Sequence, residues 1–170
     1  CKNIGIGNQA LGGTAVTGIN NIAIGTTSMD ALTTGICNIA IGTNALGAST
    51  TGCLNVAIGE SAMMGVTTGC RNIALGDGMM CSMTTGKYNV GIMHAAIRET
   101  TTGCDNIALG RQAYDAATTG CHNIALGYAA LGGAATTGND NIAIGQSAAD
   151  ALTSGNNNIA MGVNALGAST

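Results

Sequence analysis

The sequence contains no proline, phenylalanine or tryptophan, and charged residues make up only 8% of it. An average soluble domain has roughly 25% charged residues. A chain with so few charges and with 46% apolar residues has little with which to cover its own surface. We therefore expect part of that surface to be covered by a partner, and further copies of the same chain are the first candidate.

Lysine and arginine total only five and the formal net charge is -3, so the basic stripe of a nucleic-acid-binding protein is missing. No apolar run approaches the roughly 18 residues of a membrane span. No signal-peptide or transit-peptide pattern is visible. We expect neither nucleic acid nor a membrane span among the interactions of this chain.

What the sequence does contain is a repeat. The phrase Asn21-Ile22-Ala23-Ile24-Gly25 occurs, in varied form, ten times, with seven spacings of 17 residues and two of 18. A period this strict indicates a solenoid or fibre rather than an ordinary globular domain. The repeating asparagines are Asn3, Asn21, Asn38, Asn55, Asn72, Asn89, Asn106, Asn123, Asn141 and Asn158. The units are 1–18, 19–35, 36–52, 53–69, 70–86, 87–103, 104–120, 121–138, 139–155 and 156–170, and we expect 1–170 to be one solenoid segment of a longer fibre.

Within one unit, large and small residues alternate through the phrase and a glycine then ends the alternation, which is the pattern of a short β-strand. A second pair of small and large residues follows, as at Ala45-Leu46, and the unit closes on Thr-Thr-Gly, as at 33–35, 50–52 and 67–69. Helices interrupted twice per unit by glycine would be poor. The sequence therefore predicts an all-β fold, a parallel β-solenoid (β-roll) of ten coils with a 17-residue period. We expect two short strands per coil, a coil spacing of about 4.8 Å, and a positive φ at the closing glycine.

The core is expected to form from the large residues of the phrase, such as Ile22 and Ile24, together with the large residue of the second stretch, such as Met29. Burial of three such residues per coil, at about 1.5–3 kcal/mol each, would support a narrow core. The other face of the strand would then carry Asn, Ala and Gly. That face is either solvated or a close contact between chains, and the low charge content favours the contact.

The asparagines would stack above one another along the rod. Stacked asparagines hydrogen-bond to one another and to neighbouring backbone, so we expect the ladder to be structural. Binding of a ligand along the ladder is the alternative.

The phrases Asn-Ile-Ala-Ile-Gly and Thr-Thr-Gly-x-x-Asn-Ile-Ala-Leu-Gly resemble the head repeats of YadA-like trimeric autotransporter adhesins. They are also similar to related repeats in phage tail fibres and in fibre proteins of some large viruses. The resemblance covers every unit of the chain. It implies a parallel β-roll assembled as a homotrimer, with an attachment role at a cell or virion surface.

Five of the seven cysteines open a unit, and none belongs to a Cys-x-x-Cys pair. Cys53 and Cys70 are expected to be vertical neighbours, and so are Cys104 and Cys121. A coil spacing of about 4.8 Å lies within the roughly 4.4–6.8 Å between Cα atoms that a disulfide tolerates. The hypothesis is two disulfides between coils; the alternatives are small buried thiols and bridges between chains.

No constellation for catalysis is visible. His94 and His122 occupy different positions in different units, and the eight acidic residues form no recurrent pair. The unit 87–103 is irregular, with Met93 where the other nine units have glycine, and no function is assigned to it. We expect no enzyme activity, metal or cofactor.

The sequence therefore predicts a structural, non-catalytic fibre or filament that forms a rigid extracellular, cell-surface or virion-surface rod. Its partner would be itself, as a trimer or filament, and a cell-surface receptor is a further candidate. The alternative function is ice binding through the Thr-Thr-Gly ladder. Adjacent threonine side chains diverge, however, so this ladder offers one column of threonines rather than a flat array.

Overall fold

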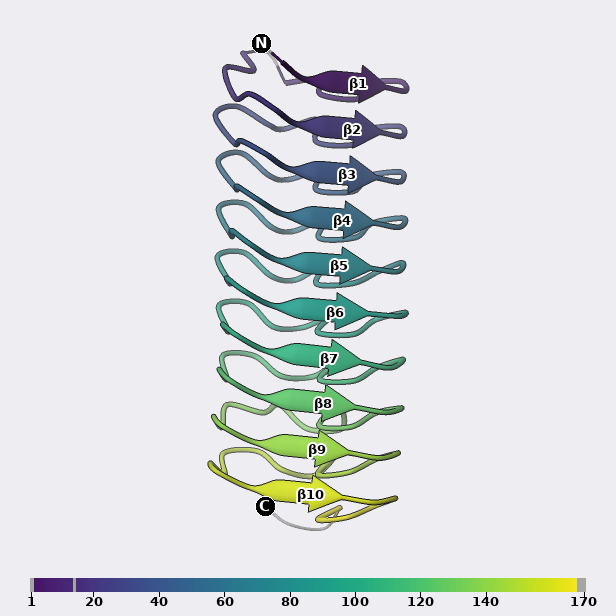
Figure 1. The fold of residues 1–170 in the computed structure, drawn as a ribbon, viewed down its shortest axis with the longest axis vertical. Helices are drawn as coiled ribbons and strands as arrows, with labels where there is room; N and C mark the ends of the chain where they lie inside the picture. The colour runs from purple at the N-terminus through teal and green to yellow at the C-terminus, as the bar shows by residue number, and fades with distance from the viewer. Residues whose placement is uncertain (1, 14, 168–170) are drawn as a thin grey trace.

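Each repeat contributes one three-residue strand, and the ten strands stack into a rod (Figure 1). The structure, a computed structural model, describes residues 2–13 and 15–167. The strands are β1 (Ile4–Ile6), β2 (Ile22–Ile24), β3 (Ile39–Ile41), β4 (Val56–Ile58), β5 (Ile73–Leu75), β6 (Val90–Ile92), β7 (Ile107–Leu109), β8 (Ile124–Leu126), β9 (Ile142–Ile144) and β10 (Ile159–Met161). Each coil is named below by its strand, so that coil 5 contains β5.

All ten strands belong to one parallel sheet, and their order in the sheet is their order in the chain. Neighbouring strands pair in register, one repeat apart: Ile22 pairs with Ile39, Ala23 with Ala40 and Ile24 with Ile41. The predicted parallel β-solenoid with its 17-residue period is confirmed. Among the described residues no helix has the length and hydrophobicity that a membrane span needs.

The prediction of a second strand in each coil is wrong. The segment after each strand, here called the return segment, is a stack of turns with two left-handed residues per coil, such as Ser61 and Met63, both with φ of 54°. Left-handed residues interrupt an extended chain, so a strand cannot form there. The turns still bond from coil to coil, as where the Met63 amide donates to the Met79 carbonyl at 2.8 Å.

The predicted direction of the strand side chains is also wrong. The small residue at the centre of each strand points inward, and Ala23, Ala40, Ala57 and Ala74 are completely buried. The large residues on either side of it are all partly or fully exposed. The inside is instead filled from the return segments, by Met29, Leu46, Met63, Met80, Ile97, Tyr114 and Leu131, which were predicted as core residues. The inside also holds the asparagine of each phrase, leaving room for an alanine but not for a second large side chain.

The closing glycine is needed for space rather than for φ. The closing glycines, such as Gly86, lie outside the left-handed region. The glycine with a positive φ is instead the one that follows the strand in nine of the ten coils, such as Gly59 with φ of 136°. A Cβ added to Gly86 would lie 2.6 Å from the carbonyl oxygen of Gly103 in the next coil. Real Cβ atoms do not approach backbone this closely, so the stack requires glycine there.

Candidate functional site

The most distinctive surface of the molecule is the outward side of the sheet, here called the outer face. It consists of the two large residues that flank the central Ala or Gly of every strand, so two ladders of Ile, Val, Leu or Met run along the rod. In the middle of the rod these side chains remain well exposed, for example Ile58 at 39% and Leu109 at 42%. Soluble monomers rarely expose a continuous apolar patch of this kind, and such patches mark interaction sites.

The asparagine ladder explains why the sheet is oriented this way. The Asn72 amide and the Asn72 Nδ2 both donate to Oδ1 of Asn55, at 3.0 and 3.1 Å, and Nδ2 also donates to the Gly86 carbonyl at 2.9 Å. Oδ1 of Asn72 in turn accepts two bonds from Asn89. Every polar group of the buried Asn72 side chain therefore has a hydrogen-bond partner. An apolar side chain at this position could not make these bonds.

The same bonding pattern continues through most of the ladder. The bonds run from Asn3 to Asn158, and Asn21 through Asn141 are buried, while Asn3 and Asn158 are partly exposed. One aromatic residue joins it: Asn123 donates from Nδ2 to the hydroxyl oxygen of Tyr114 at 2.7 Å. Burial raises the pKa of Tyr114, so its hydroxyl stays protonated. From Asn21 to Asn141 the side-chain groups of the ladder are thus occupied by contacts within the chain.

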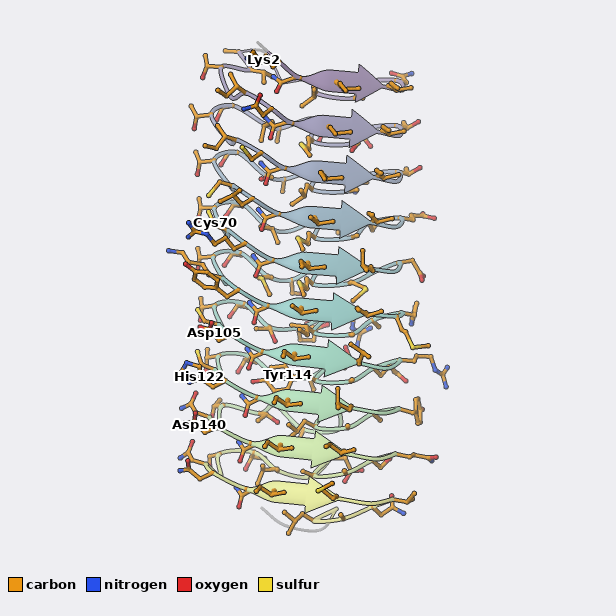
Figure 2. The ribbon with its side chains drawn as sticks, in the orientation of Figure 1. Lys2, Cys70, Asp105, Tyr114, His122 and Asp140 are labelled. Atoms are coloured by element: carbon orange, nitrogen blue, oxygen red, sulfur yellow. The ribbon has the colours of Figure 1, made fainter. Side chains whose placement is uncertain are left out.

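Two columns of residues border the outer face. The leading edge is the residue before each repeating asparagine, and the trailing edge is the residue after the position that ends the strand, which is Gly in nine coils and Met93 in coil 6. Figure 2 shows Asp105, His122 and Asp140 of the leading edge one below another along the side of the rod. His122 lies between the two carboxylates, with its Nε2 3.9 Å from Asp105 and its Nδ1 3.4 Å from Asp140.

Both arginines of these edges lie over an aromatic ring of the next coil. On the leading edge, Arg71 donates to the Tyr88 hydroxyl at 2.8 Å, and its guanidinium lies 5.4 Å from the ring centroid. On the trailing edge, the Arg111 guanidinium lies 4.7 Å from the centroid of Tyr128. Such cation–π contacts hold an arginine side chain in place beside the outer face.

The cysteines of the two predicted disulfides lie beside each other in adjacent coils. Cys53 and Cys70 form a parallel β-bridge, and the Cys53 amide lies 3.3 Å from Sγ of Cys70. The Cys104 amide lies 3.2 Å from Sγ of Cys121. The six cysteines in the described part of the chain carry free thiols. Burial raises the pKa of Cys53 and of Cys121, which lowers the fraction of each thiol that is present as the reactive thiolate.

The irregular unit 87–103 holds an ion pair on the return side. Arg98 places its Nε 2.9 Å from Oδ1 of Asp115 and donates from its terminal nitrogen to Oδ2 at 3.2 Å. Burial raises the pKa of Asp115, although Arg98 opposes that shift. Met93, in the position of the strand-ending glycine, has φ of 85° and is exposed. No sequence signal had linked Arg98 to Asp115, because they meet only through the stacking of coils.

The threonine ladder turns its first column of hydroxyls toward the backbone. Thr33 donates from Oγ1 to the Thr50 carbonyl at 3.0 Å, and Thr67 donates to the Thr84 carbonyl at 3.2 Å. The second threonine of each pair, such as Thr34, is exposed. The first column of hydroxyls is therefore bonded within the chain, whereas the second column lies at the surface.

The two histidines do not meet. His94 lies 3.6 Å from Asp77 on the trailing edge, whereas His122 lies on the leading edge. Within residues 2–13 and 15–167 no group of three His, Cys, Asp or Glu side chains could hold a metal ion. Comparisons with known protein families, curated proteins and solved structures found no match.

Proposed function

We propose that this protein is a non-catalytic structural protein that self-associates through its outer face into a rigid fibre or filament. The observation that carries the proposal is the pair of exposed apolar ladders, which continue from β1 to β10. Complete burial of such side chains is worth about 1.5–3 kcal/mol each. In the middle coils the outer-face side chains are already more than half buried in the single chain. Each would therefore contribute only part of this burial free energy on association, but the contribution repeats in every coil.

This assignment revises where the chains would meet. The sequence pointed to the Asn-Ala-Gly side of the strand as the contact between chains, but those residues lie inside the coil. The Ile, Val and Leu side chains of the outer face are the surface that a second copy would cover. The proposed homotrimer uses the three outer faces as its shared core.

The rod itself is suited to a mechanical role. Each coil is bonded to the next by the strand ladder, by the asparagine ladder and by return-segment amides. Bending the rod would stretch all three sets of bonds together. A stiff, extended, repetitive molecule of this kind fits a spacer or attachment fibre better than an enzyme. The resemblance of its repeats to adhesin heads supports an extracellular or virion-surface location. The same resemblance supports a cell-surface receptor as partner.

Two inter-coil disulfides, Cys53–Cys70 and Cys104–Cys121, are part of the proposal for the extracellular fibre. Each would form by exchange with a small-molecule disulfide, which is reduced to two thiols as the cysteine pair is oxidised. The test is intact mass with and without reductant after exposure to oxidised glutathione. Four thiols that remain freely alkylated in the folded fibre would contradict the clamp.

Self-association through the outer face is tested by a matched pair of variants. Ile58 and Met64 have nearly equal exposure, 39% and 38%, but only Ile58 lies on the outer face. We expect Ile58→Glu to lower the native mass measured by light scattering, while Met64→Glu leaves it at the wild-type value. Circular dichroism confirms that both variants fold, and equal native masses for the two variants would contradict the proposal.

A further inference from the structure

The two edges of the outer face carry the same four residue types in coils 5 to 8, displaced by two coils. Down the leading edge the residues are Arg71, Tyr88, Asp105 and His122. Down the trailing edge they are Asp77, His94, Arg111 and Tyr128. Across coil 5 the two edges therefore present Arg71 and Asp77, and across coil 6 they present Tyr88 and His94. Across coil 7 they present Asp105 and Arg111, and across coil 8 His122 and Tyr128.

These pairs cannot interact within one chain. Arg71 lies before the start of β5 and Asp77 lies after its end. The two residues are six positions apart along an extended segment, a separation of about 20 Å. That exceeds the Debye length of about 8 Å at physiological ionic strength. The contacts these residues make within the chain run along the rod instead, from Arg71 to Tyr88 and from Asp77 to His94. The complementarity across the face has no use in an isolated chain.

We propose that a second copy of the chain docks parallel to the first and without any offset along the rod, with the leading edge of one copy against the trailing edge of the other. Arg71 then faces the partner's Asp77, and Asp105 faces the partner's Arg111. Tyr88 faces the partner's His94, and His122 faces the partner's Tyr128. The inference rests on the self-association proposed above and adds the direction and register of the copies.

Zero offset is the arrangement that the charges select. It is the only offset at which both Arg71 and Arg111 meet a carboxylate of the opposite edge. A slip of two coils in one direction brings Arg71 to the partner's Arg111, and a slip of two coils in the other brings Asp105 to the partner's Asp77. Exposed charges of this kind add little affinity, but like-charge contacts exclude wrong partners and so fix register.

The same arrangement covers the apolar surface. Contact between two different edges is heterologous, so it repeats from copy to copy and closes into a ring when the rotation allows. In a closed ring the outer faces turn toward the common axis. An antiparallel dimer can bring Arg71 to the partner's Asp105, but it then places Tyr88 against the partner's Tyr88 and His122 against the partner's Leu54, and it leaves the trailing edge uncovered.

Charge reversal distinguishes these arrangements. We expect Arg71→Asp and Asp77→Arg each to raise the dissociation constant of the assembly at least about tenfold at low salt, because each places like charges together. The double variant R71D/D77R restores the pair between copies and should return to within about threefold of the wild type. The matched control is Asp140→Arg, which has the same histidine neighbour as Asp105 but faces the neutral Gln146; its dissociation constant should stay within about threefold of wild type.

A double variant R71D/D77R no better than the worse single variant would overturn the inference. Rescue by R71D/D105R instead would assign the antiparallel arrangement. Either result, obtained with a wild-type protein that self-associates, leaves the proposed function standing. A monomeric wild type contradicts both.

A second measurement does not depend on charged variants. Cys37 occupies the leading edge of coil 3, and Thr43 occupies the trailing edge of the same coil. With zero offset, Thr43→Cys should form a disulfide with the partner's Cys37 under oxidised glutathione and give covalent oligomers on a non-reducing gel. Thr26→Cys, one coil away on the same edge, is the control, and equal cross-linking of the two variants would overturn the zero offset.

Discussion

Met79 and Gly91 share one space inside the rod. A Cβ added to Gly91 would lie 2.7 Å from Cε of Met79 and 3.0 Å from Cε of Met80. Gly91 stands where eight other strands have alanine, and Met79 stands where the other coils have alanine or serine. The larger residue at one position is thus compensated by the smaller residue at the other.

This relationship predicts strong coupling between the two positions. Gly91→Ala alone should destabilise the protein by about 1–3 kcal/mol through overpacking. Met79→Ala alone should cost about 2–5 kcal/mol through the cavity it leaves. The double variant restores the pattern of the other coils, and we expect its urea midpoint to lie above that of either single variant. Additive losses in the double variant would contradict the shared space.

The asparagine ladder should be most sensitive at its centre. Asn72→Ala removes the acceptor of two Asn89 donors and the donor to the Gly86 carbonyl, all of them buried. At about 1–3 kcal/mol for each buried group left unpaired, this loss should lower the thermal midpoint strongly. Asn158, which is only partly buried, is the control, because Asn158→Ala removes one side-chain donor to Asn141 and should lower the midpoint far less. Equal effects of the two variants would contradict the greater sensitivity of the buried centre of the ladder.

Substitutions at two glycines distinguish a steric requirement for glycine from the requirement for a positive φ. Gly86→Ala places a Cβ 2.6 Å from the Gly103 carbonyl, and we expect a cost above about 3 kcal/mol, among the largest for single substitutions. Gly78 has φ of 59°, and nothing lies within 4 Å of the position that a Cβ would occupy, so Gly78→Ala should cost only about 1–2 kcal/mol. Comparison of the two urea midpoints checks the order. A Gly78→Ala variant that is the less stable of the two would contradict this explanation of the closing glycine.

Asp115 predicts a pH dependence of stability. Its side chain is 8% exposed, and burial raises its pKa above the usual 3.8. The folded state therefore binds a proton more readily than the unfolded state, so this group contributes stability that is present below pH 3.8 and is lost as pH rises through the folded-state pKa.

The measurement is the thermal midpoint of wild type and Asp115→Asn across that range. We expect the thermal midpoint of Asp115→Asn to rise relative to that of the wild type as pH increases. Arg98→Met should extend the change to higher pH, because Arg98 lowers the pKa of Asp115. A difference that does not vary with pH would contradict the role given to burial.

The period of the sequence was sufficient to predict the parallel solenoid, because in-register stacking of a 17-residue unit is what the spacing of the asparagines implies. The second stretch, with residues such as Met29 and Leu46, was also correctly assigned to the core. Both predictions depend only on which positions repeat.

The direction of the strand could not be predicted in the same way. Alternation in Asn-Ile-Ala-Ile-Gly defines two faces but not which of them is inside, and hydrophobicity, the usual guide, selects the face that lies outside in this structure. Here the polar asparagine is satisfied by groups of three coils, a network that local sequence does not reveal. The pairing of Arg98 with Asp115 was missed for the same reason.

The central claim is that the outer face is covered by further copies of the chain, and the native mass of the wild-type protein in solution tests it most directly. Light scattering beside negative-stain images should give an integral multiple of the 16.5 kDa chain, three for the trimer, with rods or filaments of constant width. A monodisperse species of 16.5 kDa that remains monomeric at high concentration would contradict it.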